Sequence, residues 1–417
     1  MKNFFLKSLK LFVVPAFLLC ISLPAFAQKS LTQKTGTKSY KVSFAPDVWF
    51  NSTDGIRVGL RMKGKEPGTF KEGPHRLNVG VWFSTFLPKY PVSYYISFTE
   101  PIKAISKFNS EASVKLRSSI RTGYEKHTVS FKKRWQPGFN EKNYRTIAIN
   151  FRAEKRFDDN YLFYPQIWQH KWLYIIGLNY SMTNGNPLGR YKLQSSTSIN
   201  IAGHYDRFIN TRFNAQQRVP LGSGFTFKGR LFIGLSSNNS APEYLFSRSL
   251  EPYTRWQRLG TTRARGTIPT AWMHEGFIQI EGGADIRGYT SQDIKQLNQG
   301  KAPIYTSMGS VNAELTFPNP ISQSMKKIPV IGGLFKLNSY LFFDSGTSLG
   351  LTNREEGRVL SDAGPGIKLS LNIPDYLGQS RGFAIRYDVP LWLSNPAKGE
   401  PEFKYRNLLG IGAIISF

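Results

Sequence analysis

Two short motifs contain residue types that catalyse reactions in other proteins. Gly346–Gly350 reads Gly-x-Ser-x-Gly, the spacing that presents a nucleophilic serine between a strand and a helix. A polar loop, Leu351–Arg354, follows Ser348 where that geometry requires a helix. His274-Glu275 begins the zinc-binding pattern His-Glu-x-x-His, but Ile278 stands where the second histidine is required. We therefore expect no enzyme, no metal site and no cofactor.

Cations dominate the charged side chains. Lys and Arg number 55 against 27 Asp and Glu, which gives a formal charge of +28. Many cations alternate with apolar residues and therefore share one face of a predicted strand. A wall of such residues would favour anions or lipid phosphates, and a solvated wall without selectivity is the alternative. The inferred set is Arg57, Arg61, Arg117, Arg121, Arg152, Arg190, Lys228, Arg230, Lys368 and Arg386.

Alternation of polar and apolar residues runs through most of the chain, as in Ile56–Lys63 and Gly366–Ile373. A period of two is typical of strands with one polar and one apolar face. The pattern predicts about 16 strands, an even number as bacterial barrels generally have. Their expected ranges are 43–50, 56–63, 76–84, 92–100, 112–121, 124–135, 144–157, 171–182, 190–201, 205–218, 224–235, 305–318, 336–345, 361–373, 382–391 and 405–417.

Three features favour an antiparallel transmembrane barrel over a soluble sandwich. The strands run to about 9–12 residues, as a tilted strand needs to cross a bilayer. Aromatic residues such as Trp82 and Trp135 stand near strand ends, where interfacial girdles lie. The polar face is strongly charged, which a wet lumen permits. The stretch 236–304 then reads as one long loop, and we assign a further strand candidate, Glu275–Ile280, to that loop.

The first 27 residues read as a cleaved signal peptide. Three lysines precede a short apolar run, and Ala25-Phe26-Ala27 gives a small-x-small cleavage pattern. The one cysteine of the sequence, Cys20, lies within this leader, so the mature chain has no disulfide. We expect export to the cell outer membrane, with a short segment at 28–42 and the barrel at 43–417.

Five short motifs follow one another in the second half of the chain. They are Gly282–Tyr289, Asn312–Pro318, Phe342–Gly346, Ala363–Ile367 and Arg386–Pro390. The order resembles the outer-membrane assembly and secretion barrels, or bacterial surface antigens, which include Bam-type, Tam-type and two-partner-secretion proteins. The resemblance covers roughly residues 219–417. It implies a barrel whose long sixth extracellular loop inserts into the lumen.

The resemblance also implies a contact between this loop and the barrel wall. In the family, a (Val/Ile)-Arg-Gly-(Phe/Tyr) loop tip meets acidic residues of the next two strands. Carried over, Arg287, Gly288 and Tyr289 form the tip, and Glu314 and Asp344 are its partners. The alternation places both acids on the polar face, where a guanidinium suits two carboxylates. Gly288 would let the chain turn sharply.

The chain departs from the family in what precedes the barrel. Periplasmic POTRA modules need about 75 residues each, as the resemblance implies, and the leader leaves too little sequence before residue 43 for one. We therefore expect a periplasmic or outer-membrane protein partner to replace them. A similar barrel can follow a zinc aminopeptidase domain in larger chains, so a remnant of such a metallopeptidase is one alternative.

The seam between the first and last strands is expected to be weak. Pro46 interrupts the first strand, and a proline is tolerated at edges or bulges. The last strand carries Gly410 and Gly412 and ends at the aromatic Phe417, which resembles the C-terminal signal of outer-membrane barrels. Such a seam could open sideways or recruit another chain.

The predicted function is insertion or translocation of protein or lipid, across or into the outer membrane. The predicted partners are outer-membrane lipid or lipopolysaccharide, together with the protein partner, and no nucleic acid, because an exported protein does not meet it. The main alternative is a passive, anion-preferring channel.

Overall fold

A computed structural model describes residues 40–51, 53–66, 75–87, 89–138, 140, 142–159, 164–203, 206–251, 253–254, 270–326, 328, 334–348, 357–374 and 380–415. The chain divides into two units, residues 1–41 and 42–417, and the account below concerns the second. The predicted signal peptide, residues 1–27, and Phe417 lie outside the described residues. None of the helices in those ranges is long and apolar enough to cross a membrane.

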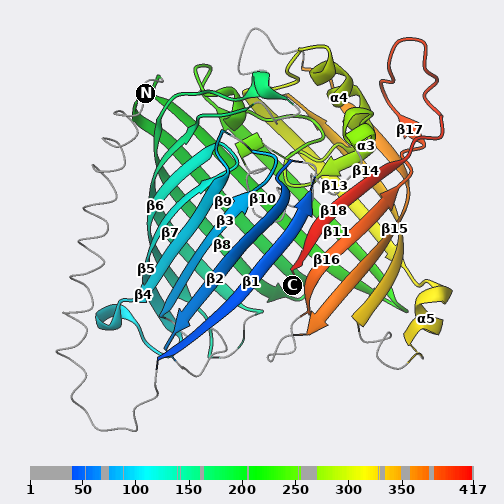
Figure 1. Ribbon diagram of the computed structural model, residues 1–417. Helices are drawn as coiled ribbons and strands as arrows, with labels where there is room; N and C mark the ends of the chain where they lie inside the picture. The colour runs from blue at the N-terminus through cyan, green and yellow to red at the C-terminus, as the bar shows by residue number, and fades with distance from the viewer. Residues whose placement is uncertain are drawn as a thin grey trace. The chain divides into compact units, whose positions relative to one another are not determined.

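One all-β sheet dominates the second unit (Figure 1). It contains 18 strands, so the prediction of 16 is wrong as a strand count. The strands are β1 (Lys41–Asn51), β2 (Gly55–Lys65), β3 (Arg76–Ser84), β4 (Val92–Pro101), β5 (Ser110–Arg121), β6 (Tyr124–Trp135), β7 (Tyr144–Arg156), β8 (Leu173–Asn186), β9 (Gly189–Gly203), β10 (Phe208–Gly222), β11 (Phe225–Ser236), β12 (Ile278–Ile280), β13 (Ser307–Phe317), β14 (Phe335–Thr347), β15 (Leu360–Pro374), β16 (Ser380–Asp388), β17 (Trp392–Leu393) and β18 (Leu408–Ile415).

The two additional strands are short. β12 lies inside the segment that we assigned to the long loop, and it pairs in parallel with β18. β17 pairs with β15 through Trp392 and Leu393. It is separated from β16 because Pro390 lacks the N–H that a continuous ladder needs. A strand of two or three residues is too short to show alternation, which explains why the sequence pattern missed both.

Antiparallel pairing joins the long strands in sequence order, from β2–β3 through β10–β11 to β11–β13 and β13–β14. Tight hairpins fix the register. At the β5–β6 hairpin, Thr122 and Gly123 both have positive φ, the backbone that a two-residue turn between twisted strands requires. The series continues through β14, β15 and β16 to β18, and β1 pairs with β2.

The two faces of the sheet differ as the alternation predicts. One face carries exposed apolar side chains along nearly every long strand, among them Val58, Val81, Ile149, Leu178, Val311 and Ile367. The opposite face, called the inner face below, carries buried polar side chains such as Arg57, Asn150, Asn312, Asp344 and Asp388. Trp82 also points to the inner face, where its Nε1 donates to Asp47 Oδ2 at 2.8 Å, so it does not belong to an outer aromatic girdle.

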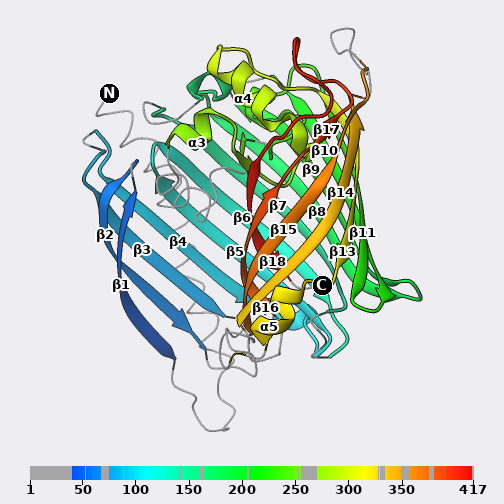
Figure 2. The ribbon, with the colours of Figure 1, turned by 90° about the vertical axis from the view of Figure 1, so that its right-hand side faces the viewer.

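The connection from β11 to β13 is folded against this inner face. It contains the helical turn η3 (Pro242–Tyr244), α3 (Thr270–His274), β12, η5 (Arg287–Tyr289) and α4 (Thr290–Asn298). Figures 1 and 2 show α3 and α4 at the same end of the sheet as β17. The connection packs through two apolar clusters, one around Ile286 and Tyr289 and the other around Ile294 and Leu297. We call the residues 237–306 the plug.

Candidate functional site

Arg287, in η5 of the plug, lies among three carboxylates of the sheet. Its Nε is 2.5 Å from Asp344 Oδ2 and its Nη2 is 3.1 Å from Asp344 Oδ1, a bidentate pair. Glu314 Oε1 is 3.2 Å from Nη2, and Asp388 Oδ1 is 3.4 Å from Nη1. Arg287 is 3% exposed, so the ion pairs are shielded from water. We call Arg287 and these three carboxylates the clamp.

Strand register brings the carboxylates of the clamp together. Asn312 of β13 is the register partner of Asp344 in β14, and its Nδ2 donates to Asp344 Oδ1 at 3.0 Å. Glu314 lies two residues further along β13 and therefore on the same face. Asp388 is the last residue of β16, and the hydroxyl of Tyr340 in β14 donates to Asp388 Oδ1 at 2.5 Å. The structure thus brings the predicted Arg287, Glu314 and Asp344 together and adds Asp388.

Gly288 and Tyr289 fit the plug tip closely against β15 and β17. A Cβ at Gly288 would stand 2.4 Å from Leu393 Cδ2 and 2.7 Å from Asp362 Cβ. Gly288 is needed for this close approach and not for the sharp turn that we expected, because it lies within the helical turn η5. The Tyr289 hydroxyl donates to the Ser361 carbonyl at 3.3 Å and accepts from the Asn395 N–H at 3.1 Å.

Charge keeps Arg287 ionised in this buried place. Burial alone would lower the pKa of Arg287, but the carboxylates of Asp344, Asp388 and Glu314 raise that pKa well above its ordinary value. A permanently charged guanidinium that is taken out of water holds its partners firmly, because removing either side leaves an uncompensated buried charge. The clamp therefore attaches the plug to three strands of the sheet.

Two more arginines of the predicted basic set contact the plug. Arg230 Nη1 is 3.1 Å from Asp285 Oδ2 and 2.7 Å from Asn312 Oδ1. Arg386 Nη1 is 3.0 Å from Glu281 Oε1, and its Nη2 donates to Gln279 Oε1 at 2.6 Å. The sequence does not predict the roles of Asp285 and Glu281, because nothing in their spacing shows that the plug folds back onto β11 and β16.

The other predicted cations divide between the two halves of the sheet. Lys228 lies 3.6 Å from Glu314, and Lys368 is the register partner of Arg386, so both stand near the clamp. Arg190 donates to the Asn143 side chain and the Lys142 carbonyl at the edge of β9. Arg57 packs over the Trp82 ring, 4.5 Å from its centroid. Arg61, Arg117, Arg121 and Arg152 line one cavity on the inner face of β2–β10.

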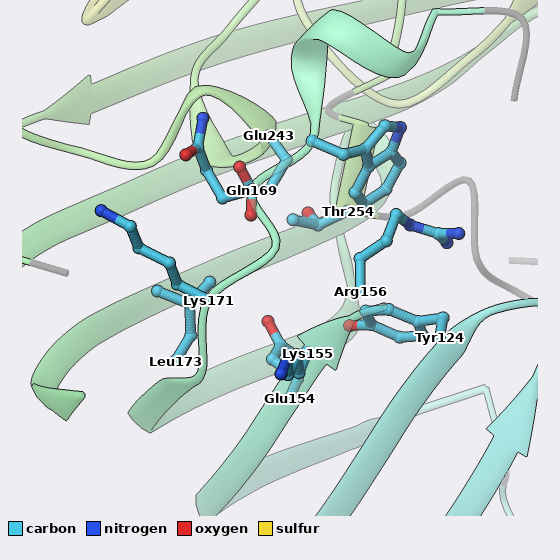
Figure 3. A pocket seen from close by; sticks show the side chains of 10 residues that line it. Tyr124, Glu154, Lys155, Arg156, Gln169, Lys171, Leu173, Glu243 and Thr254 are labelled. Carbon is cyan, nitrogen blue, oxygen red and sulfur yellow. The ribbon is translucent and has the colours of Figure 1, made fainter. Parts of the chain in front are cut away.

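A second contact joins the plug to the N-terminal half of the sheet. Tyr244 of η3 donates its hydroxyl to Glu154 of β7, and Lys126 Nζ is 3.1 Å from the other oxygen of Glu154. Figure 3 shows Glu154 with Glu243, the neighbour of Tyr244, in a small pocket. Burial raises the pKa of Glu243 to about 8. Arg156 of the same pocket lies between the rings of Tyr124 and Trp168, at 5.3 and 4.7 Å.

The predicted seam is arranged differently from our expectation. Residues of β12, not of β1, pair with β18 in the described part of the chain: Ile278 with Leu409, Gln279 with Gly410 and Ile280 with Ile411. The Leu409 N–H donates to the Phe277 carbonyl at 2.6 Å. A Cβ at Gly410 would stand 2.9 Å from Arg386 Nε, so this glycine lets Arg386 cross β18 toward the plug. Pro46 lies in β1 and Gly412 in β18.

Comparisons with known proteins found no matching family model and no matching curated protein. Among solved structures, the chain is similar to BamA from Haemophilus ducreyi lacking POTRA domains 1–3, with 13% identity, a TM-score of 0.46, and coverage of 90% of this chain and 71% of that one. It is also similar to CdiB from Escherichia coli, with 10% identity, a TM-score of 0.45, and coverage of 92% of this chain and 64% of that one.

A third similar structure is CdiB from Acinetobacter baumannii, with 11% identity and a TM-score of 0.39. This match covers 91% of this chain and 66% of that one, so the chain spans about two thirds of the CdiB structures. All three likenesses have an identity of 13% or less and a TM-score below 0.5.

Proposed function

We propose that the chain is an outer-membrane barrel that inserts or translocates protein or lipid, with residues 43–417 as the barrel and the plug inside it. The observation that carries the proposal is the double role of the plug. The same segment that the clamp holds to the inner face also supplies β12, which covers an edge of the last long strand.

The apolar outer face supports a position within a membrane. Exposed side chains such as Phe44, Leu60, Phe131, Leu178 and Phe343 would meet lipid acyl chains, while ionic side chains would face an enclosed interior. Every backbone N–H and C=O within a bilayer needs a partner, and at residues 409–411 β12 provides one for the edge of β18. We therefore propose that β12 takes the place of the first strand at this edge in the resting protein.

The pairing of β12 with β18 supports a seam that exchanges partners. A strand edge has unpaired N–H and C=O groups that can bind another strand. In the resting arrangement β12 occupies residues 409–411 of that edge with three register pairs, whereas β16 pairs with β18 through eight. Release of so short a strand would free the edge for a substrate strand, or open a lateral path for lipid, at a small energetic cost.

A tether tests this proposal directly. Ile278→Cys with Leu409→Cys joins register partners of β12 and β18, so oxidation would hold the edge closed. In one assay, a different, eight-stranded outer-membrane barrel protein is unfolded in urea and added to liposomes that contain the protein, and its folding is followed. In a second assay, a labelled lipid reports exchange between the two leaflets. We expect the reduced variant to accelerate folding or exchange, and oxidation to abolish that acceleration.

A matched pair provides the control. Thr226→Cys with Thr316→Cys joins β11 and β13, which are already paired, so this tether should leave activity unchanged. If the oxidised 278–409 tether is as active as the control, the proposal is wrong. Single-channel recording in a planar bilayer addresses the alternative, because a passive channel would give a large and steady conductance where a plugged protein gives a small one.

A further inference from the structure

The inner face of β2–β10 borders an open cavity of about 640 Å³, which the plug residues Tyr244 and Thr254 also line. This is the size of a site for a ligand of several hundred daltons. Seven cationic side chains line it together with one carboxylate, Glu154. The seven cations are Arg61, Lys63, Arg117, Arg121, Lys126, Arg152 and Arg212.

The single carboxylate does not neutralise this wall. Glu154 is 3% exposed, and this one carboxylate is shared by Tyr244, Lys126 and Arg152. Arg61 has a distant partner, because its Nε lies 3.6 Å from Asp47 Oδ2. The lining as a whole carries more cations than carboxylates, and a basic hollow of this kind attracts an anion more strongly than an open surface does.

Arg117 and Arg152 line this cavity in neighbouring positions. Arg117 of β5, Thr128 of β6 and Arg152 of β7 are successive register partners, so they form one row across three strands. Neighbouring strands lie about 4.8 Å apart, which places the two arginine backbones about 10 Å from each other. The Nε atoms of Arg117 and Arg152 are buried and have no hydrogen-bond partner among the described residues. Buried donors of this kind are normally satisfied, by protein, water or ligand.

The rest of the lining suits a sugar. Asn78, Asn179, Ser119, Ser196 and Ser198 offer amide and hydroxyl groups, which exchange hydrogen bonds with the hydroxyls of a sugar. Trp82 and Tyr95 add aromatic surface for the apolar side of a sugar ring. Arg152 Nη2 donates to Ser198 Oγ at 3.1 Å and Arg117 lies over Tyr95, 5.3 Å from the ring centroid, so cationic, hydroxyl and aromatic groups are interleaved.

We propose that this cavity binds an anionic sugar, a short saccharide bearing at least two phosphate or carboxylate groups, with Arg117 and Arg152 as its principal anion-binding residues. Two separate charges on the ligand match the two arginines of the row, and hydroxyls between them match the serine and asparagine side chains. The ligand could be the headgroup of a membrane glycolipid or part of a soluble polysaccharide. The proposal does not depend on whether the seam opens.

Binding to the purified full chain in detergent micelles tests the proposal. The probes are an acyl-free glucosamine disaccharide with two phosphates, tetragalacturonate, and neutral maltotetraose, and calorimetry gives each dissociation constant. We expect both anionic sugars to bind and maltotetraose to bind at least about tenfold more weakly, since charge-assisted hydrogen bonds are lost. The double variant R117Q/R152Q should weaken binding of the anionic sugars by about tenfold or more.

The control removes two other cations from the same face of the sheet. Lys115 of β5 and Lys132 of β6 alternate with the outward-facing Val114 and Phe131 and do not line the cavity. K115Q/K132Q should change binding less than about threefold, because neither lysine lines the cavity and salt weakens their remaining effect on the ligand. Resistance of each variant to unfolding on a semi-native gel confirms that all of them are folded.

A vesicle arm identifies the source of the ligand. The same bisphosphorylated disaccharide is presented as an acylated headgroup in vesicles and compared with the acyl-free form. If the acyl-free form binds and R117Q/R152Q weakens that binding, the ligand comes from a soluble source. If only the acylated form binds and R117Q/R152Q weakens that binding, the ligand comes from the membrane. The proposal is overturned if maltotetraose binds as tightly as the anionic sugars. It is also overturned if R117Q/R152Q leaves the binding of both the acyl-free and the acylated sugar unchanged.

Discussion

Arginines on the two halves of the inner face, β11–β16 and β2–β10, have different surroundings. On β11–β16, arginines and carboxylates are matched, and Arg287, Arg230 and Arg386 each have acidic partners within 3.1 Å. On β2–β10, cations outnumber acids around an open cavity. The difference teaches that an inward arginine has no fixed role. It attaches the plug where the two share an ion pair, and it lines a cavity on β2–β10.

The largest effect should come from removing the cation of the clamp. Arg287→Ala leaves Asp344, Asp388 and Glu314 buried without their common partner, a loss of about 3–5 kcal/mol for the attachment of the plug. We expect faster proteolysis within residues 237–306 and a large rise in single-channel conductance. R117Q in the other half should alter neither readout, and an unchanged conductance in R287A would contradict the comparison.

A smaller loss is expected where the plug tip meets the sheet. Gly288→Ala places a methyl group against Leu393 and Asp362, and overpacking of this kind costs about 1–3 kcal/mol. The urea concentration at which the plug becomes protease-sensitive should fall. Gly357→Ala is a suitable control, because no atom of the described residues lies within 4 Å of a Cβ there, and equal behaviour of the two variants would show that the tip is not tightly packed.

The N-terminal contact of the plug should depend on pH. The pKa of Glu243 is raised from 4.5 to about 8, first by burial and then by Glu154, against the opposing effect of Arg156. Since the pKa is higher in the docked plug, this group's contribution to docking is complete below about pH 4.5 and is lost as the pH rises toward 8. Lys155 and Lys171 line the same pocket.

Glu243→Gln keeps the shape of the side chain and cannot ionise. The protease sensitivity of the plug near residue 243 should therefore stay low in E243Q from pH 5 to pH 9, whereas that of the wild type should increase over the same range. Parallel pH profiles for the two proteins would show that Glu243 does not govern this contact, and would leave the clamp as the principal attachment of the plug.

The smallest effect should follow from an exposed ion pair at the margin of the clamp. Lys228 Nζ lies 3.6 Å from Glu314 Oε2, and the Lys228 side chain is 39% exposed. Pairs of this kind contribute about 0–1 kcal/mol. Lys228→Gln should therefore leave conductance and protease sensitivity within error of the wild type, and a change as large as that of R287A would mean that the clamp depends on more than Arg287.

Local alternation predicted the long strands well, because the period of two in Ile56–Lys63 or Gly366–Ile373 is a property of each strand alone. The clamp residues Arg287, Glu314 and Asp344 were proposed from the resemblance together with that alternation. Asp388 could have been added, since it stands in the motif Arg386–Pro390 and shares the polar face with Arg386.

The contacts of the plug could not be predicted from local pattern. β12 is defined by pairing with residues more than a hundred positions away, and its three residues are too few to show a period. Asp285 and Glu281 become partners of Arg230 and Arg386 only after the plug folds back. The same missing information made the basic wall look uniform in the sequence, although Asp285 and Glu281 of the plug pair with arginines of its C-terminal half.

Disulfide yield in native outer membranes tests the central claim most directly, that the plug strand and not the first strand covers the edge of β18. Two cysteine pairs are compared under mild oxidation: 278 with 409, which are register partners, and 48 with 413, which join β1 to β18. The account predicts rapid, nearly complete cross-linking of 278–409 and little of 48–413 in the resting protein. Complete cross-linking of 48–413 with none of 278–409 would contradict it.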